Sequence, residues 1–260
     1  MLAIILAVFC LLATGLLDLV FKLYATGSNS RGLMMVGVGG IWASLQLAFI
    51  FANGHSLSLD HTTLLYGGLT AAVLVMSNLL LLETMGRLSV SIASTIYRLN
   101  TVPLVLLAIV FLDEDPGWLK LFGVALGLLC VWLLYSKADN VVTSKVFVRW
   151  FLLIIVACCL RALYGVFLKS GLTAGAVADS MMLLAAIAWL FGGLLHFWLI
   201  DSVRQVKRNA IWLIVLAGAL VFTIVWLLTT ALSLADALTV MPIANMGSVS
   251  YTHLTLPTKA

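Results

Sequence analysis

The chain has 260 residues, of which 63% are hydrophobic and 9% are charged. This composition excludes a sizeable soluble domain and indicates a protein that resides in a membrane. The formal net charge of +4 comes from basic residues spread over short polar turns rather than gathered in one patch, so we expect no nucleic-acid partner.

Nine apolar stretches follow one another along the chain. A hydrocarbon core about 30 Å thick requires roughly 20 apolar residues in a helix, and most of the stretches are close to this length. They are continuous rather than alternating, which favours helices over a β-barrel. The predicted spans are residues 2–24, 32–52, 62–82, 89–112, 118–135, 150–169, 180–200, 210–230 and a ninth that begins near residue 236. We therefore predict an all-α integral membrane protein whose outer surface contacts membrane lipid.

The loops between these spans, counted together with the residues at the span ends beside them, differ in basic charge. The even-numbered loops contain only Lys120 and Lys169. The odd-numbered loops contain nine basic residues, which are Lys22, Arg31, Arg87, Lys137, Lys145, Arg149, Arg204, Lys207 and Arg208. Cytoplasmic loops of membrane proteins are enriched in Lys and Arg. The count therefore predicts that the odd-numbered loops face the cytoplasm and that the N-terminus faces outward.

A polar linker at residues 137–148 separates two halves that share a faint order of residues. Lys22 closes the first span and Lys169 closes the sixth, and a Met-Met pair follows in each half. Two copies of a repeat with an odd number of spans lie in opposite orientations, which is the inverted-repeat plan of many secondary transporters. We predict two inverted repeats of five transmembrane helices, in residues 1–136 and 149–248.

The second repeat is expected to be incomplete. The ninth span loses its apolar character after Asn245, and no tenth span follows it. Residues 249–260 resemble the conceptual translation of a sequencing adapter, and we interpret them as an artefact outside the fold. A native polar tail is the alternative interpretation.

The fourth and fifth spans contain a distinctive order of residues. Small residues at 91–94 are followed by Pro103 within the span, by an acidic turn that includes Glu114, and by Gly123 and Gly127 in the next span. This order resembles that of the EamA-type branch of the drug/metabolite transporter superfamily, and the resemblance covers essentially the whole chain before its tail. It implies ten spans in two inverted halves, with export or exchange of small metabolites or drugs across a bacterial inner membrane.

The resemblance also implies roles for individual residues. Lys22 and Lys169 match a lysine that commonly closes the first helix of each family repeat, and Glu114 matches a glutamate in the turn after the fourth helix. Asp113 stands where a glycine is usual. The family is usually drawn with both termini in the cytoplasm, which conflicts with the orientation that the loop charges predict, so both orientations stay open.

Three charged side chains lie more than a few residues from the ends of the predicted spans, namely Asp18, Arg98 and Arg161. A charge at membrane depth costs at least about 2.5 kcal/mol on insertion scales, so each is a candidate functional residue. Asp18 has Lys22 one helical turn away, and it is either half of a self-neutralised pair or a proton-coupling site. Neither arginine has an acid three or four residues away, so each needs an acid or carbonyl on another helix, water or an anionic substrate.

These charges predict an electropositive cavity. The planar arginine fork binds a carboxylate or phosphate through two parallel hydrogen bonds, and Tyr97 and Asn100 lie beside Arg98, so we favour Arg98 as the anchor of such a substrate. For Arg161, snorkelling or bonding to backbone carbonyls is the alternative to substrate contact. Asn78 in the third span is a further candidate for substrate contact, and a hydrogen bond to a neighbouring helix is its alternative role.

Prolines and asparagines recur together in the fourth and ninth spans. Asn100 precedes Pro103, and Pro242 precedes Asn245. A proline frees a backbone carbonyl and loosens a helix, so these positions are candidates for hinges and, at the asparagines, for substrate binding. We expect the two regions to face each other across a pseudo-twofold axis.

Two further patterns have simpler interpretations. Gly123 and Gly127 form a GxxxG pattern, for which we favour packing within the chain, with a homodimer contact as the alternative. His55, His61 and His196 lie at span ends and are interpreted as interfacial imidazoles.

The predicted function is that of a secondary transporter, or permease, which moves a small anionic or zwitterionic metabolite or drug-like solute by alternating access. We expect no cofactor and no metal. One alternative is a membrane-embedded enzyme that acts on lipid, which would require a nucleophile or a paired acid and base at one depth. Another alternative is a membrane scaffold without transport activity.

Overall fold

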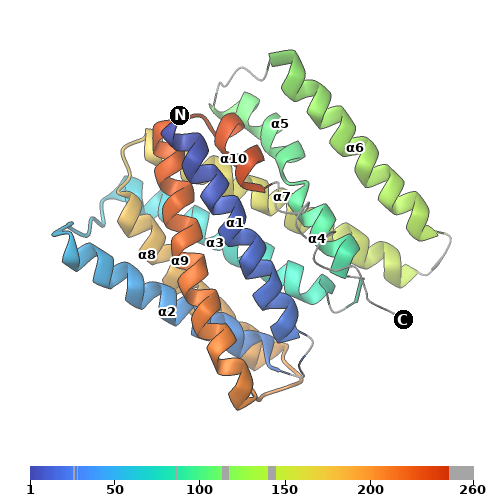
Figure 1. The fold of residues 1–260 in the computed structure, drawn as a ribbon, viewed down its shortest axis with the longest axis horizontal. Helices are drawn as coiled ribbons and strands as arrows, with labels where there is room; N and C mark the ends of the chain where they lie inside the picture. Colours follow the sequence, from blue (N-terminus) through green and yellow to red (C-terminus); the bar gives the residue numbers. More distant parts are fainter. Residues whose placement is uncertain are drawn as a thin grey trace.

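The computed structural model describes residues 1–25, 27, 29–85, 87–88, 90–112, 117–139 and 145–245. This part of the chain folds into helices and contains no strand (Figure 1). Its elements are α1 (Leu2–Ala25), α2 (Arg31–Ala52), α3 (His61–Met85), α4 (Val90–Arg98), α5 (Thr101–Leu112), α6 (Gly117–Asp139), α7 (Lys145–Thr173), α8 (Ala178–Leu199), the 3-10 helix η1 (Arg208–Ala210), α9 (Ile211–Leu234) and α10 (Ala237–Asn245).

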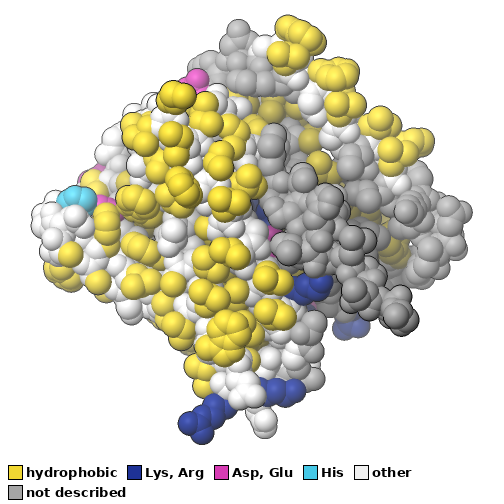
Figure 2. All heavy atoms as spheres, viewed as in Figure 1, with side chains coloured by type: hydrophobic (Ala, Val, Ile, Leu, Met, Phe, Trp, Pro, Cys, Tyr) yellow, Lys and Arg dark blue, Asp and Glu magenta, His cyan; other side chains and the backbone are white. Residues whose placement is uncertain are grey.

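Seven segments among the described residues are long and apolar enough to cross a membrane. They lie in α1, α2, α3, the end of α4 with α5, α7, α8, and η1 with α9. The outer face of the bundle is apolar as well, because Phe9, Leu12 and Leu16 of α1 are each 56% exposed. Figure 2 shows hydrophobic side chains spread over the surface formed by α1 and α9. The chain is therefore an all-α, multi-pass membrane protein, as its composition predicted.

The two remaining predicted spans, the fifth and the ninth, are also helical, but they are not among the seven segments that are long and apolar enough to cross a membrane. α6 covers the predicted fifth span, packs mainly against α5 and lies at the edge of the bundle (Figure 1). α10 covers the ninth span from Ala237 to Asn245, the last described residue. α6 and α7 extend from either side into the predicted linker at 137–148. Glu114 and the suspected adapter tail at 249–260 lie outside the described residues.

Polar side chains fix the starts of α2 and α3. The hydroxyl of Ser30 accepts a hydrogen bond from the amide of Leu33 (3.0 Å). Asp60 accepts hydrogen bonds from the amide of Thr63 (3.1 Å) and from the hydroxyls of Ser58 and Thr63 (2.6 Å each). These bonds favour the ionised carboxylate and lower the pKa of Asp60 to about 2. Both caps supply partners for amides that the first turn of a helix leaves unpaired.

The backbones of α2 and α8 approach each other closely. These two helices run antiparallel, since Gly32 of α2 lies beside Phe197 whereas Gly39 lies beside Leu190. A Cβ atom built on Gly193 of α8 would stand 2.7 Å from atoms of α2, so no larger residue fits there without a shift. Small residues permit such close contact between helices in a membrane.

The other helices pack around this pair in a matching way. α3 packs against α7 and α8, and α9 packs against α1 and α2. α5 packs against α7, and α10 packs against α1. The same set of contacts results when α1 is exchanged with α7, α2 with α8, α3 with α9, and α5 with α10.

The predicted fourth span at 89–112 is broken into two helices. α4 ends at Arg98, and α5 begins at Thr101 after a two-residue turn. Pro242, by contrast, lies inside α10, which runs from Ala237 to Asn245 without a break. The break lies where the sequence predicted a loosened helix.

Hydrogen bonds at this break explain its position. Pro103 has no amide hydrogen to donate to the carbonyl of Leu99, and that carbonyl accepts the amide of Val102 instead (2.9 Å). The side-chain amide of Asn100 donates to the carbonyl of Tyr97 (2.9 Å). The turn therefore satisfies its own carbonyls, as a break at membrane depth must.

One of the two glycines in the GxxxG pattern of α6 packs against another helix. Gly127 lies directly against the side chain of Val102 on α5, whereas a Cβ at Gly123 would meet no described atom within 4 Å. Gly127 thus serves packing within the chain, and the homodimer contact stays a prediction.

Candidate functional site

A cavity of about 830 Å³ lies inside the bundle. Its wall is formed by α1, α2, α3, α4, α7, α8 and α9, by Asn245, and by loop residues that follow α1, α3 and α8. The inner end lies between Thr14 and Arg161, which are in the middle parts of their helices. The outer end reaches Arg87 and Ser202, which are exposed at the ends of α3 and α8. The cavity therefore opens at one end of the bundle.

Most of the residues singled out from the sequence line this cavity, although they are far apart in the chain. The lining includes Asp18, Lys22, Asn78, Tyr97, Arg98, Asn100, Arg161 and Asn245. The other candidates in the described part of the chain, which do not line it, are Pro103, Pro242, Gly123, Gly127 and Lys169. The sequence-derived candidates thus separate into one group at the cavity and one group that shapes or packs the helices.

An ion pair joins α1 to α4 at the inner end. It forms between Oδ2 of Asp18 and Nη2 of Arg98, whose side chains are 21% and 9% exposed. Arg98 is the last residue of α4, so the break in the fourth span places its side chain at the cavity. The sequence offered Lys22 as the partner of Asp18, whereas the structure pairs Asp18 with an arginine of another helix.

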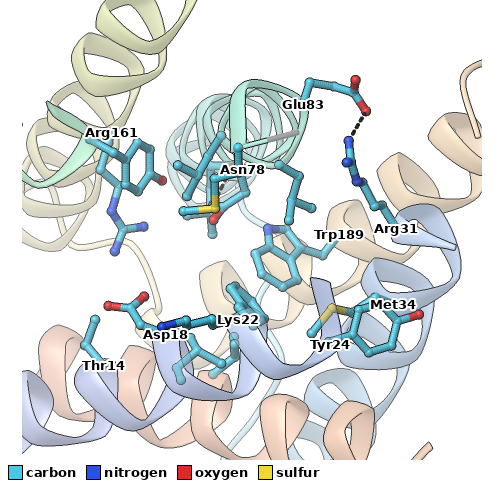
Figure 3. A pocket seen from close by; sticks show the side chains of 18 of the residues that line it. Thr14, Asp18, Lys22, Tyr24, Arg31, Met34, Asn78, Glu83, Arg161 and Trp189 are labelled. Carbon is cyan, nitrogen blue, oxygen red and sulfur yellow. Dashed lines mark hydrogen bonds and ion pairs between the residues drawn. The ribbon is translucent and has the colours of Figure 1, made fainter. Parts of the chain in front are cut away.

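Arg161 and Lys22 point into the same space. Figure 3 shows the guanidinium of Arg161 directed toward Asp18, with Lys22 near the same carboxylate. The guanidinium carbon of Arg161 lies 4.6 Å from the ring centroid of Tyr164, which is a cation–π contact. Within the described residues, neither Arg161 nor Lys22 forms an ion pair. The inner end of the cavity therefore carries two basic side chains without a paired carboxylate.

The asparagine candidates are hydrogen-bonded. Asn245 of α10 donates to Oδ1 of Asn100 (2.8 Å), so the two regions face each other as the sequence predicted. Asn78 donates to a carbonyl of its own helix (2.8 Å), while its side chain still lines the cavity. The hydroxyl of Tyr97 donates to Ser77 (3.4 Å). These residues form a polar wall around the charged centre.

A charged network at the outer end was not anticipated from the sequence. Nη1 of Arg31 lies 3.3 Å from Oε1 of Glu83 (Figure 3), and Nε2 of His196 donates to the same oxygen (2.9 Å). Nδ1 of His196 lies 3.6 Å from Oδ1 of Asp201. His196 lies in the last turn of α8, at the end of a span as the sequence indicated, but it is only 2% exposed and contacts two acids. The network ties α2, α3 and α8 together where the cavity opens.

Asp201 also forms hydrogen bonds with residues at the start of α2. It accepts hydrogen bonds from the amide of Gly32 (2.9 Å) and from the hydroxyl of Ser30. The hydroxyl of Tyr24 in turn donates to the carbonyl of Ser30 (2.6 Å). An acid is favourable at the N-terminus of a helix. The signal in the sequence was weak, because charged residues at span ends are common and their partners lie far away in the chain.

A different set of contacts closes the opposite end of the bundle. Asp179, in the first turn of α8, accepts hydrogen bonds from Nε2 of Gln46 (3.1 Å) and Nδ1 of His55 (2.6 Å). Gln46 is completely buried. The amide of Ser58 donates to the hydroxyl of Ser180 (3.0 Å). The loop after α2 is therefore fastened onto the start of α8.

Lys169 strengthens the same closed end. Its Nζ donates to the carbonyls of Leu232 and Ala235, at 2.9 Å each. These carbonyls belong to the C-terminal end of α9, where a positive charge is favourable. Lys22, its counterpart in the first half, lines the cavity instead. The two lysines that the family resemblance pointed to thus have different surroundings.

Comparison with known proteins identifies a fold that this chain shares with solved structures. No protein-family profile and no curated protein matches the chain. Solved structures match it, and one of them, known only as "Crystal structure of protein", superposes with a TM-score of 0.73. The match covers 99% of this chain and 90% of the other, at 18% sequence identity. At this identity the likeness shows a shared fold alone.

Proposed function

We propose that the protein is a secondary transporter of the EamA type, which moves a small anionic or zwitterionic solute across a bacterial inner membrane by alternating access. The observation that carries this proposal is the one-ended cavity. It runs from Asp18, Arg98 and Arg161 in the interior to one end of the bundle, while Asp179 and its partners fasten the other end. A carrier that opens to one side at a time requires such an arrangement.

The packing of the helices supports an inverted repeat. α2 and α8 are counterparts in the two halves, and they run antiparallel. Counterpart helices are parallel when the halves are related by an axis along the membrane normal, and antiparallel when the axis lies in the membrane plane. The antiparallel pair therefore favours two halves of opposite orientation, which give a carrier two equivalent gates.

The broken fourth span supports a solute site at the cavity. Irregular backbone at membrane depth is tolerated where it lines a water-filled space, and transporters commonly build their substrate sites from discontinuous helices. Arg98 and Asn100 lie at the break and line the cavity. We assign them to the solute site together with Arg161.

The charge of the loops suggests which side the cavity faces. Its open end carries Arg31 and Arg87, and the exposed Arg204 and Lys207 lie in the loop that follows α8. The end rich in Lys and Arg is normally cytoplasmic. The conformation described here is then the inward-facing one.

A release screen tests the proposal. Cells that express the full-length protein are compared with cells that lack it, and anionic metabolites in the medium are quantified by mass spectrometry. We expect at least one small anion to accumulate outside the expressing cells. Its exchange is then measured in proteoliposomes that contain the purified protein.

The Arg98→Ala variant separates transport from a scaffold role. We expect transport to be lost at a normal amount of protein in the membrane, because the solute site loses the arginine at the break of the fourth span. Arg204→Ala, an exposed arginine outside the cavity, is the matched control and should transport normally. Reduced expression of Arg98→Ala with an unchanged flux per molecule would support a scaffold instead.

A further inference from the structure

We propose that the inner end of the cavity selects solutes that carry two negative charges, such as phosphate monoesters or dicarboxylates, and that Arg161 and Lys22 provide this selectivity. The inference rests on the proposed transport function and narrows its solute class. It follows from the charges that meet inside the cavity and from the groups that remain unpaired there.

The inner end carries an excess of two positive charges. Three basic side chains, Lys22, Arg98 and Arg161, and one acid, Asp18, line it. The ion pair of Asp18 with Arg98 cancels one positive charge. An uncompensated charge at membrane depth is costly, and two of them in one chamber are more so. A solute with two negative charges neutralises the chamber, whereas a singly charged solute leaves one cation without a partner.

The outer end does not add to this excess. The charged residues that line it are Arg31, Arg87, Glu83 and Asp201, which are two bases and two acids. Arg31 is already joined to Glu83. Discrimination by charge therefore depends on the inner end of the cavity.

The two cations are suited to different parts of a doubly charged anion. Arg161 lies on α7 and presents a planar fork that can grip two oxygens of one carboxylate or phosphate. Lys22 lies on α1 and acts as a compact point charge. Figure 3 shows both directed into the cavity from different helices, with Asp18 between them. The carboxylate of Asp18 marks the position at which a negative group is stabilised.

A further hydrogen-bond donor in the wall of the cavity also lacks a partner. The indole nitrogen of Trp189 is buried and has no hydrogen-bond partner among the described residues, and the side chain lines the cavity next to Asn78 (Figure 3). An indole nitrogen donates only. The indole N–H and the two unpaired cations suit an anion, while Phe21 and Met34 supply an apolar wall for its carbon skeleton.

The test measures binding to the full-length protein in lipid nanodiscs at neutral pH. The probes are glycerol 3-phosphate and succinate as dianions, lactate as a monoanion and glycerol as a neutral solute. We expect the dianions to bind at least about tenfold more tightly than lactate, which corresponds to about 1.4 kcal/mol, and glycerol not to bind. Lys22→Gln and Arg161→Gln should each bring the dianions to the affinity of lactate.

Matched controls separate this effect from general attraction to a basic protein. Lys207→Gln and Arg204→Gln remove the same charges from exposed positions that do not line the cavity, and they should leave the preference intact. Lys22→Arg and Arg161→Lys keep the charge and should retain most of it. Thermal unfolding without probe identifies any variant that does not fold, and the Gln variant at the other of the two positions then tests the loss.

The outcomes distinguish this inference from the proposed function. Equal binding of dianions and lactate, or no binding of either dianion at millimolar concentration, overturns the dianion selectivity, even if the proteoliposomes transport another solute. An equal loss in the exposed controls overturns it as well. Selective binding without any flux supports the inference about the site and speaks against transport.

Discussion

At the scale of single residues, Asp18 is the acid that meets the basic side chains at the inner end of the cavity. It is the acid paired with Arg98, and it faces the space into which Arg161 and Lys22 point. A carboxylate in this position can serve as a counter-ion, and it can also take up a proton during transport.

Asp18→Asn tests the proton role. Asparagine keeps the shape of the side chain but cannot accept a proton, so we expect proton-driven accumulation of the solute to be lost while exchange of solute for solute continues. Both are measured in proteoliposomes. Unchanged driven accumulation would remove Asp18 from proton coupling.

The same substitution leaves Arg98 without its acid. We expect a loss of about 1–3 kcal/mol in unfolding free energy, less than for a fully enclosed pair because the cavity admits water. The double variant Asp18→Asn with Arg98→Gln should regain most of this loss, since no unpaired charge remains. Thermal unfolding in detergent, followed by protein fluorescence, compares the two.

The sequence predicted the residues of the interior better than their partners. A charge inside an apolar stretch is conspicuous, so Asp18, Arg98 and Arg161 were identified directly. Their pairing depends on which helices are neighbours, and a local rule proposed Lys22 instead. Glu83 and His196 were missed because polar residues at the ends of spans are ordinary, and their burial appears only when α3 and α8 come together.

At the scale of elements, the contact between α2 and α8 sets the strictest limit on substitution. A Cβ at Gly193 would stand 2.7 Å from the Cβ of Met35 and from the amide nitrogen of Val36. We expect Gly193→Ala to lower the unfolding free energy by about 1–3 kcal/mol, because the backbone of α2 must move away.

Gly68→Ala is the control for this prediction. Gly68 lies on α3, is exposed, and would meet no described atom within 4 Å if it carried a Cβ. This variant should be neutral or slightly more stable, since alanine favours a helix over glycine by about 0.5–1 kcal/mol. Equal behaviour of the two variants in a thermal unfolding assay would show that α2 and α8 tolerate separation.

The sequence predicted the positions of the long helices better than the break in the fourth span. The apolar stretches located the long helices, and Asn100 with Pro103 indicated where the fourth span weakens. It did not show that this span forms two helices, because that depends on carbonyls being satisfied at the turn by Asn100 and Val102. The separation of α6 from the main bundle also left no local signal.

At the scale of the whole molecule, the open end of the cavity and the loop charges together predict an orientation. In a background without the native cysteines, Ser202→Cys places a thiol at the open end, and Ser56→Cys places one in the loop of the closed end. We expect an impermeant maleimide to label Ser56→Cys in intact cells, and Ser202→Cys only in inverted membrane vesicles. Labelling in the opposite order would place the termini as the family resemblance implies, with the open end outside.

The order of residues in the two halves was too faint to establish more than a repeat. The matched positions of Lys22 and Lys169 suggested one, and the exchangeable helix contacts agree with it. The sequence could not foresee that the two lysines differ in their surroundings, because those surroundings depend on which helices pack around each lysine.

The close contact of α2 and α8 at their glycines also limits how these two helices can move relative to each other. Helices separated by a layer of side chains can slide as those side chains change rotamer, but backbones in direct contact have no such layer. α2 and α8 should therefore act as a fixed pivot. Exchange of the open and closed ends would then require the other helices to move, including α7 and α9, which Lys169 joins at the closed end. A disulfide engineered between α2 and α8 should leave turnover unimpaired.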